Sequence, residues 1–276
     1  MKYKELYEKG IDMLTGAGIE EAALDARLLL EYACHTNRND LLVHGDREVE
    51  DRQQESYMNF LAQRQEHKPL QYITGEQEFM GLVFEVNSQV LIPRQDTETL
   101  VEEVMRQLHD GMSILDMCTG SGCILLSLLH YSNHCTGVGV DLSGEALDVA
   151  DRNAKRLGIE NCSLIQSDLF EAVEGCYDFI VSNPPYIRTK IIPTLMSEVK
   201  DYEPYMALDG REDGLFFYRK IAAQAVDYLQ KGGFLFFEIG YDQAQEVVEI
   251  LEKEGFQDVV VVKDLAGLDR VVYGWR

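Results

Sequence analysis

The stretch Tyr177–Ile187 reads Y-D-F-I-V-S-N-P-P-Y-I and predicts a buried strand that ends in a rigid turn. Its apolar run is short and partly β-branched, as in the strands of parallel sheets. Pro184 lacks an N–H group, and Pro185 holds it in an extended conformation. The turn therefore offers the side-chain oxygen of Asn183 and the carbonyl oxygen of Pro184 as acceptors, beside the ring of Tyr186. This arrangement suits the planar NH2 group of a carboxamide or a nucleobase; the alternative is an ordinary strand end with a proline stop.

Around this strand, strand and helix patterns alternate along residues 113–276, which predicts an α/β fold. The expected sheet is doubly wound and mostly parallel, because helical patterns that can cover both of its faces separate most of the apolar runs. The seven expected strands are Ser113–Met117, Thr136–Val140, Cys162–Gln166, Phe179–Ser182, Gly233–Ile239, Val259–Asp264 and Arg270–Trp275. The helical patterns are Gly144–Leu157, Tyr218–Leu229 and Gln243–Glu254, and Gly120–Leu129 is expected to be a loop followed by a helix. The last two strands are expected to pair in antiparallel fashion at the sheet edge.

Residues 1–70 carry only helical patterns and predict a small bundle that forms a separate N-terminal domain. The expected helices are Tyr3–Leu14, Ile19–Cys34, a short helix capped by Asn39 and Asp40, and Asp51–Glu66. This domain holds no candidate catalytic group. We therefore expect it to bind a partner or to steady the larger domain.

Residues 71–95 are expected to form a β-hairpin linker between the bundle and a third domain, residues 96–276. Glycines and alternating apolar positions predict that Glu78–Leu82 pairs with Val83–Val86 around a turn near Gly81.

The sequence L-I-P-R-Q-D-T-E follows the hairpin and leads into a helix. Asp96 or Thr97 is the expected N-cap of this helix, because both residue types accept hydrogen bonds from free N–H groups of a first turn. Arg94 is a candidate to face the active site.

The composition narrows the class of ligand. The 276 residues carry a net charge of −23, and such a field repels phosphate backbones, which disfavours nucleic acid as the principal ligand. The six cysteines show no C-x-x-C pair and no zinc-like spacing, so we expect reduced thiols and no metal. No signal peptide and no apolar run of about 18 residues is present, which favours a cytoplasmic location.

A strand, a turn of small residues and a helix start follow one another in I-L-D-M-C-T-G-S-G-C-I, residues 114–124. Such a turn lets a ligand approach the backbone, but the third glycine of a dinucleotide fingerprint is missing. Asp116 closes this strand, and Asp141 closes the next strand, where a carboxylate can accept both hydroxyls of a ribose. Asp168 follows the third strand and can accept from an adenine amino group, with Leu169 against the ring. Parallel strands bring these groups to one edge of the sheet.

The combination of L-D-M-C-T-G-S-G, V-D-L-S, S-D-L-F and S-N-P-P-Y-I resembles class I S-adenosylmethionine-dependent methyltransferases that modify amino groups. The stretches G-E-Q-E-F-M-G, L-I-P-R-Q-D-T-E and E-P-Y-M-A-L-D-G-R-E-D-G-L-F-F-Y resemble the HemK/PrmC family in particular. The resemblance covers nearly the whole chain and implies a Rossmann-like methyltransferase sheet. It also implies methyl transfer from S-adenosyl-L-methionine to the side-chain amide nitrogen of the glutamine in the Gly-Gly-Gln motif of class I peptide release factors, which modulates translation termination.

The resemblance also implies roles for individual residues. The loop that should cradle the methionine part of the cofactor consists of Cys118, Thr119, Gly120, Ser121 and Gly122. Asp141 should bind the ribose, and Asp168 and Leu169 the adenine. The residues that should grip the glutamine amide are Asn183, Pro184, Pro185 and Tyr186, and Asn183 should touch the cofactor as well. Asn183, Pro184 and Tyr186 are the expected catalytic residues.

Two residues depart from the family pattern: Cys118 stands where glycine is common, and Gln95 where proline is common. Three other functions remain open at this point. An amino-methyltransferase acting on adenine or another base in RNA or DNA uses the same turn, although the charge opposes it. A nicotinamide-dependent oxidoreductase is opposed by the incomplete glycine fingerprint, and a non-catalytic adaptor has no need of the N-P-P-Y turn. The expected enzyme is a monomer without metal.

Overall fold

The computed structural model describes all 276 residues, which divide into two units. The smaller unit consists of Met1–Gly75 and Met196–Tyr202, and the larger unit of Glu76–Leu195 and Glu203–Arg276. None of the helices combines the length and the apolar character that crossing a membrane requires.

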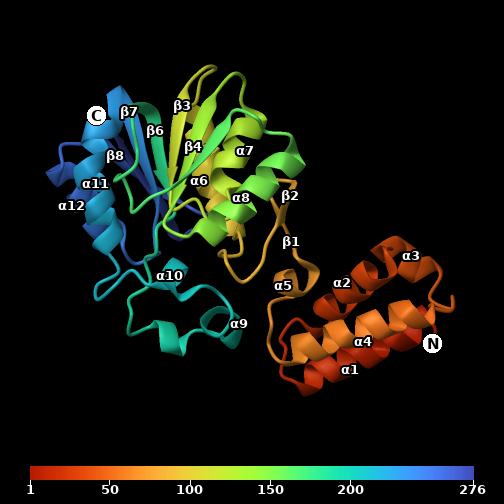
Figure 1. Cartoon of the computed structure of the whole chain (residues 1–276). Coiled ribbons are helices and arrows are strands. Elements are labelled where there is room, and N and C mark those ends of the chain that lie inside the picture. The colour runs from red at the N-terminus through yellow and green to blue at the C-terminus, as the bar shows by residue number, and fades with distance from the viewer. The chain divides into compact units, whose positions relative to one another are not determined.

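The smaller unit is a helical bundle with one hydrophobic core. Its helices from the N-terminal segment are α1 (Tyr3–Gly16), α2 (Ala22–Cys34), α3 (Arg38–Val43), α4 (Asp51–Gln65) and α5 (Leu70–Thr74), drawn in red and orange in Figure 1. Tyr57 of α4 is fully buried, and its hydroxyl donates to the carbonyl of Ala26, 3.1 Å away. Gly10 of α1 lies against this ring, since an added Cβ would stand 1.9 Å from the Tyr57 oxygen. The predicted bundle is confirmed, but α2 begins at Ala22 rather than Ile19 and α5 was not predicted. The cap of α3 is Asn37, whose side chain accepts from the N–H of Asp40, rather than Asn39 and Asp40.

A short segment from the second half of the chain also belongs to the smaller unit. It contains α9 (Ser197–Lys200), and Glu198 on this helix accepts a hydrogen bond of 3.0 Å from Nη2 of Arg64. The same guanidinium donates from Nε to Asp25 over 2.7 Å, and the hydroxyl of Tyr202 donates to the carbonyl of Glu66. Arg64 therefore joins three parts of the chain inside this unit.

The larger unit begins with an antiparallel hairpin formed by β1 (Glu76–Phe79) and β2 (Leu82–Glu85). The predicted turn near Gly81 is confirmed, but the strand bounds differ. Met80 and Gly81 both have positive φ and make the turn, so β1 ends at Phe79 and β2 begins at Leu82.

The predicted mostly parallel, seven-stranded sheet is confirmed, with the strand order β5-β4-β3-β6-β7-β9-β8. Its strands are β3 (Ser113–Met117), β4 (Thr136–Asp141), β5 (Cys162–Gln166), β6 (Tyr177–Ser182), β7 (Leu229–Glu238), β8 (Gln257–Lys263) and β9 (Asp269–Trp275). The strands from β5 to β7 run parallel, whereas β9 and β8 pair in antiparallel fashion. Of this last pair only β8 is an edge strand, because β9 inserts between it and β7.

Helices cover both faces of the sheet, as the doubly wound prediction requires (Figure 1). On one side lie α6 (Glu98–Gln107), α7 (Cys123–Tyr131) and α8 (Gly144–Leu157), and on the other α11 (Phe216–Tyr228) and α12 (Ala244–Lys253). Short helical turns complete the unit: η1 (Gln95–Thr97), η2 (Ile192–Thr194) and α10 (Tyr205–Leu208). Because side chains alternate along a strand, Ile180 of β6 packs into the core with α11 and α12, while its neighbours Phe179 and Val181 pack into the core with α6 and α7.

Candidate active site

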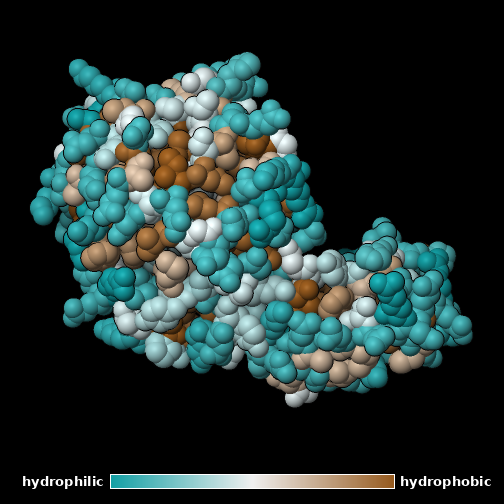
Figure 2. Space-filling view, viewed as in Figure 1, coloured by the Kyte–Doolittle hydropathy of each residue, from teal (hydrophilic) through white to brown (hydrophobic).

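The carboxyl ends of β3, β4, β5 and β6 meet at one edge of the sheet, where a pocket opens. Register places Met117 beside both Val140 and Ser182, so the loops that follow these residues start at the same level. The pocket is lined by these expected residues: Cys118, Thr119, Gly120, Ser121, Asp141, Asp168, Leu169, Asn183 and Pro185. Three others, Gly122, Pro184 and Tyr186, lie outside the lining. On the face drawn in Figure 2, apolar residues gather near the middle of the larger unit, with hydrophilic residues around them.

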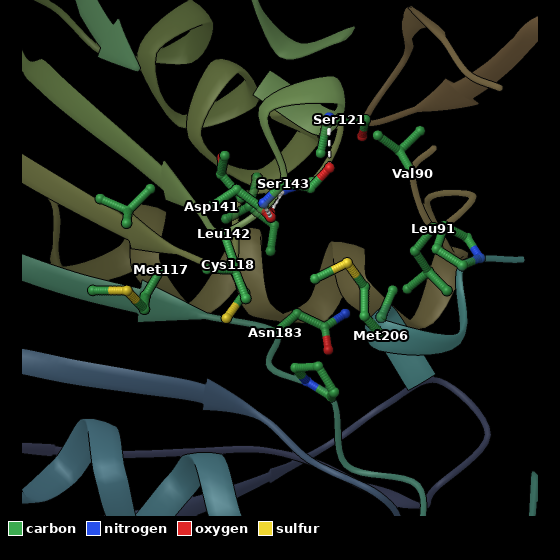
Figure 3. Close-up of a pocket in the computed structure, with 18 of the residues that line it drawn as sticks. Val90, Leu91, Met117, Cys118, Ser121, Asp141, Leu142, Ser143, Asn183 and Met206 are labelled. Atoms are coloured by element: carbon green, nitrogen blue, oxygen red, sulfur yellow. Dashed lines mark hydrogen bonds between the residues drawn. The ribbon is translucent and has the colours of Figure 1, made fainter. Parts of the chain in front are cut away.

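Left-handed backbone conformations shape the loop after β3. Cys118, Gly120 and Gly122 have φ angles of 64°, 55° and 79°. At Gly122 an added Cβ would stand 3.0 Å from the side chain of Leu126, so this position disfavours a side chain by contact as well as by conformation. The predicted loop and helix over residues 120–129 are confirmed: the two glycines form the turn, and the helix begins at Cys123. Cys118 adopts a conformation that glycine adopts more easily, and Figure 3 shows its side chain next to Asn183.

Asp141 organises this loop from the end of β4. Its Oδ2 accepts from the N–H of Gly120 and its Oδ1 from the N–H of Ser143, each over 2.9 Å (Figure 3). Burial raises the pKa of Asp141, and the N–H groups partly oppose this effect. Each carboxylate oxygen can accept more than one hydrogen bond, so Asp141 keeps acceptor capacity for a ligand in the pocket.

Asp116, which was expected among the acids at the sheet edge, does not line the pocket. Its side chain is fully buried and accepts a 2.6 Å hydrogen bond from the Thr119 hydroxyl. Its other oxygen, Oδ1, is buried without a partner at full hydrogen-bond geometry. Burial raises the pKa of Asp116 to about 7, and the Thr119 hydrogen bond opposes this rise. Asp116 therefore supports the loop from behind.

A residue that the sequence did not single out, Asn153 of α8, ties the loop to the hairpin. It is fully buried, and its Nδ2 donates to the carbonyls of Ser121 and Glu85 over 2.9 and 3.0 Å. Its Oδ1 accepts from the N–H of Glu85 over 2.6 Å. Nothing in the local sequence distinguishes this asparagine from a surface residue of an amphipathic helix.

Asn183 extends from the end of β6 into the pocket (Figure 3). Its Nδ2 donates to Oγ1 of Thr97, 3.4 Å away, which leaves the side-chain oxygen as an acceptor. Thr97 occupies the N-cap position of α6, as expected, but its side chain makes no capping hydrogen bond. The preceding residue, Ser182, donates to the carbonyl of Met117 over 2.6 Å and so joins the ends of β6 and β3.

Tyr186 lies behind the turn, and its polar groups are held by the protein. Its hydroxyl donates to Oε1 of Glu238 over 3.4 Å, and burial raises its pKa. Its carbonyl accepts from Nε2 of Gln243, which also donates to the carbonyl of Gly214, while the Gln243 oxygen accepts from the N–H of Gly240. The turn is thus anchored by one buried amide.

Glu238, at the end of β7, was not anticipated either. It is 2% exposed, and its Oε2 is buried without a partner at full hydrogen-bond geometry. Burial raises its pKa to about 7, against the opposing effects of the Thr97 hydroxyl and the Arg270 guanidinium. A carboxyl in this environment titrates near neutral pH.

Arg94 lines the pocket, in agreement with the expectation, and is the only cationic side chain that does. It forms an ion pair with Glu203, which is buried. Two apolar segments that the sequence did not assign to the pocket complete it: Val90 and Leu91 before η1, and Met206 and Ala207 of α10. Figure 3 shows Met206 beside Asn183.

Comparison with known proteins identifies relatives over the whole chain. Residues 5–75 match the PrmC N-terminal domain, and residues 94–198 match the methyltransferase small domain. The release factor glutamine methyltransferase of Clostridium acetobutylicum is 40% identical over 284 residues, which cover 100% of this chain and 99% of the relative. That of Geobacter sulfurreducens is 42% identical over 262 residues, covering 95% and 92%. Among solved structures, a methyltransferase from Pyrococcus furiosus shares the fold, with a TM-score of 0.54 and 20% identity over 71% of this chain and 90% of that one.

Proposed function

Because the chain belongs to the release factor glutamine methyltransferase family, we propose that it methylates the glutamine of the Gly-Gly-Gln motif in class I peptide release factors. The methyl group goes from S-adenosyl-L-methionine to the side-chain amide nitrogen and modulates translation termination. The observation that carries this proposal is that the acceptor oxygen of Asn183 shares one pocket with the glycine loop, Asp141 and Asp168.

The lining of the pocket fits S-adenosylmethionine. Asp141 keeps acceptor capacity for two ribose hydroxyls after it has bound two backbone N–H groups. Residues 118–121 of the loop present backbone for the methionine part, and Asp168 and Leu169 offer an acceptor and an apolar side chain for the adenine. When bound, this cofactor supplies an electrophilic methyl group on a sulfonium.

The chain's own residues must then make a poor nucleophile react. The nitrogen lone pair of an amide is delocalised into its carbonyl, which makes the nitrogen a poor nucleophile. As this nitrogen begins to bond to the methyl carbon, positive charge develops on it and on its N–H groups. In this proposal Oδ1 of Asn183 and the carbonyl oxygen of Pro184, a residue outside the lining but between two residues that line the pocket, accept these two N–H groups and stabilise that charge. The effect is about 3 kcal/mol for one well-placed hydrogen bond. Pro185 and Tyr186 keep the turn rigid, and holding the amide in line lowers the barrier further.

No general base is needed in this scheme, because a protonated amide is a strong acid and loses its proton to water. A hydrogen-bond donor at the glutamine carbonyl would draw the lone pair away from the nitrogen and make it a weaker nucleophile. An apolar environment around that carbonyl therefore favours the reaction. Leu91, Pro93 and Met206 supply apolar surface in the pocket.

The test is to incubate the purified chain with S-adenosylmethionine and a class I release factor, and to measure the Gly-Gly-Gln peptide by mass spectrometry. One added methyl group on that glutamine is expected, and none with the Asn183→Ala variant, which should still bind the cofactor in calorimetry. Total RNA with labelled cofactor is the parallel arm. Label in RNA with an unmodified release factor overturns the proposal.

We further propose a division of labour along the chain. Residues 1–70 bind the release factor, residues 71–95 connect, and residues 96–276 carry out the transfer. The enzyme works as a monomer in the cytoplasm, where release factors act, and the net charge of −23 argues against direct binding of nucleic acid.

A further inference from the structure

We propose that Thr97 is a positioning residue that determines which end of the Asn183 side-chain amide faces the substrate. This inference deepens the proposed function and rests on it. It starts from the contact between the Asn183 Nδ2 and the Thr97 Oγ1, 3.4 Å apart, in a pocket that both residues line.

The two ends of an asparagine amide have nearly the same size, so packing alone does not select one orientation. Hydrogen bonds select it, because the NH2 end only donates and the oxygen only accepts. The substrate amide offers N–H groups, so Asn183 is useful only with its oxygen directed at the substrate. A partner that accepts from the Asn183 NH2 end is therefore required, and Thr97 is that partner in the structure.

A hydroxyl can donate as well as accept, so the direction of the Thr97 hydroxyl must itself be set. Glu238 lies next to Thr97, and its Oε2 is a buried acceptor without a partner at full hydrogen-bond geometry. In its ionised form Glu238 only accepts, and it then draws the hydroxyl proton of Thr97 toward itself. The oxygen of Thr97 then has lone pairs left for Asn183. The Glu238 carboxylate therefore sets the direction of the Thr97 hydroxyl, and this hydroxyl sets the orientation of the Asn183 amide.

Thr97 is suited to this role by its place in the fold. It is 2% exposed, and its side chain makes no capping hydrogen bond although it stands at the start of α6. Tyr186 directs its hydroxyl to the other oxygen of Glu238. One buried carboxyl therefore orders both sides of the turn that begins at Asn183.

The inference predicts a change in specificity that a merely structural role does not. In the wild-type enzyme, a release factor whose target glutamine is replaced by glutamate meets the Asn183 oxygen with an acceptor and binds poorly. Without the Thr97 hydroxyl, the Asn183 amide rotates and offers its NH2 end to that carboxylate. Discrimination between the glutamine and glutamate factors should then fall.

The experiment compares the wild type with Thr97→Val, Thr97→Ser and Thr97→Ala. Thr136→Val serves as the control, since Thr136 is an exposed threonine at the opposite end of β4. The measurements are kcat and KM with the natural release factor, the cofactor Kd by calorimetry, and the inhibition constant of the glutamate factor. For Thr97→Val we expect kcat to fall at least about tenfold, as for a lost hydrogen bond near a charged group, with the cofactor Kd unchanged. The inhibition constant of the glutamate factor should fall relative to the KM for the natural one.

Thr97→Ser keeps the hydroxyl and should restore kcat and discrimination, which separates the hydrogen bond from packing. Thr97→Ala decides the question if valine disturbs cofactor binding. If Thr97→Val or Thr97→Ala binds the cofactor normally and still discriminates between the two release factors as the wild type does, the inference is overturned. It is also overturned if Thr97→Ser does not restore kcat and discrimination. A wild-type enzyme that leaves the release factor unmodified refutes the proposed function instead, so the two failures are distinguishable.

Discussion

The buried carboxyl of Asp116 makes the stability of the larger unit depend on pH, and Asp116→Asn should remove that dependence. Burial raises the pKa of this group to about 7, so the folded chain holds a proton that the unfolded chain releases at much lower pH. A raised carboxyl pKa stabilises the fold at low pH, and this contribution disappears as the pH rises through the folded-state value. Asparagine keeps the acceptor for Thr119 and carries no charge at any pH.

The size of the effect follows from the linkage between proton binding and folding. Between pH 6 and pH 8 the contribution of one such group to the unfolding free energy falls by about 1.4 kcal/mol, the value of one pKa unit. For a domain of this size that corresponds to roughly 3 to 5 °C in Tm. The pH dependence of wild type minus variant is the quantity to compare, because Glu238 and the overall charge act in both proteins.

The assay is urea denaturation at pH 6 and pH 8, without cofactor, followed by tryptophan fluorescence. Trp275 in β9 is the single tryptophan, so its signal reports the larger unit alone. Between pH 6 and pH 8 the unfolding free energy of the wild type should fall by about 1.4 kcal/mol more than that of Asp116→Asn. Asp148→Asn, an exposed position on α8, removes the same formal charge and should behave as the wild type. Equal pH dependence in the wild type and Asp116→Asn would refute the reasoning.

Three further predictions test the loop and the smaller unit. Asp141→Asn turns a donor toward one of two backbone N–H groups, and the cofactor Kd measured by calorimetry should rise at least about tenfold; an unchanged Kd contradicts the assigned role. Asn153→Leu should destabilise the larger unit by about 2–4 kcal/mol in urea titrations, because backbone groups of Glu85 and Ser121 lose their hydrogen-bond partner. A loss under about 0.5 kcal/mol would argue against this supporting role of Asn153. Arg64→Met leaves the carboxylates of Asp25 and Glu198 without their cation, so the smaller unit should lose about 3 kcal/mol and the segment near Lys200 should become sensitive to trypsin. Unchanged cleavage would show that the segment is held without Arg64.

The positions of the central strands could be predicted because strands buried on both faces are continuous apolar runs. The bounds of β3, a central strand, agree with the prediction at both ends, and so do those of β5, although β5 is an edge strand whose residues are partly exposed. The start of β7 could not be predicted in this way. It begins at Leu229, where Gln230, Lys231 and Gly232 resemble a turn, and only pairing of Leu229 with Tyr177 extends the strand so far.

The site was predictable to the extent that strand ends determine it. Asp141 ends a parallel strand, and Asp168 and Asn183 each follow one; such ends converge whatever the intervening sequence is. Asp116 was misplaced because it stands one residue before the end of β3. Side chains alternate along a strand, so this residue faces the opposite side from Leu115 and Met117 and lies beneath the loop.

The supporting contacts were out of reach of a single sequence. Thr97 and Asn183 are 86 residues apart, and Asn153 and Glu85 are 68 residues apart. The sequence singles out Asn183 and Thr97 separately and gives no signal for Asn153, and only the folded chain shows which residues are partners. The same holds for α9, whose polar sequence gives no reason to expect it in the smaller unit.

The environment of Arg94 agrees with the chemistry of an amide nucleophile. A free guanidinium in the pocket would compete for the glutamine carbonyl, stabilise the resonance form with charge on oxygen and weaken the nitrogen as a nucleophile. Glu203 is buried and paired with Arg94, and burial raises the pKa of this carboxyl while the Arg94 charge opposes the rise. The pair keeps the cation directed at a carboxylate of the protein. In the proposed mechanism, the acceptors of the N-P-P-Y turn are then free to act on the N–H groups of the substrate amide, where the positive charge develops.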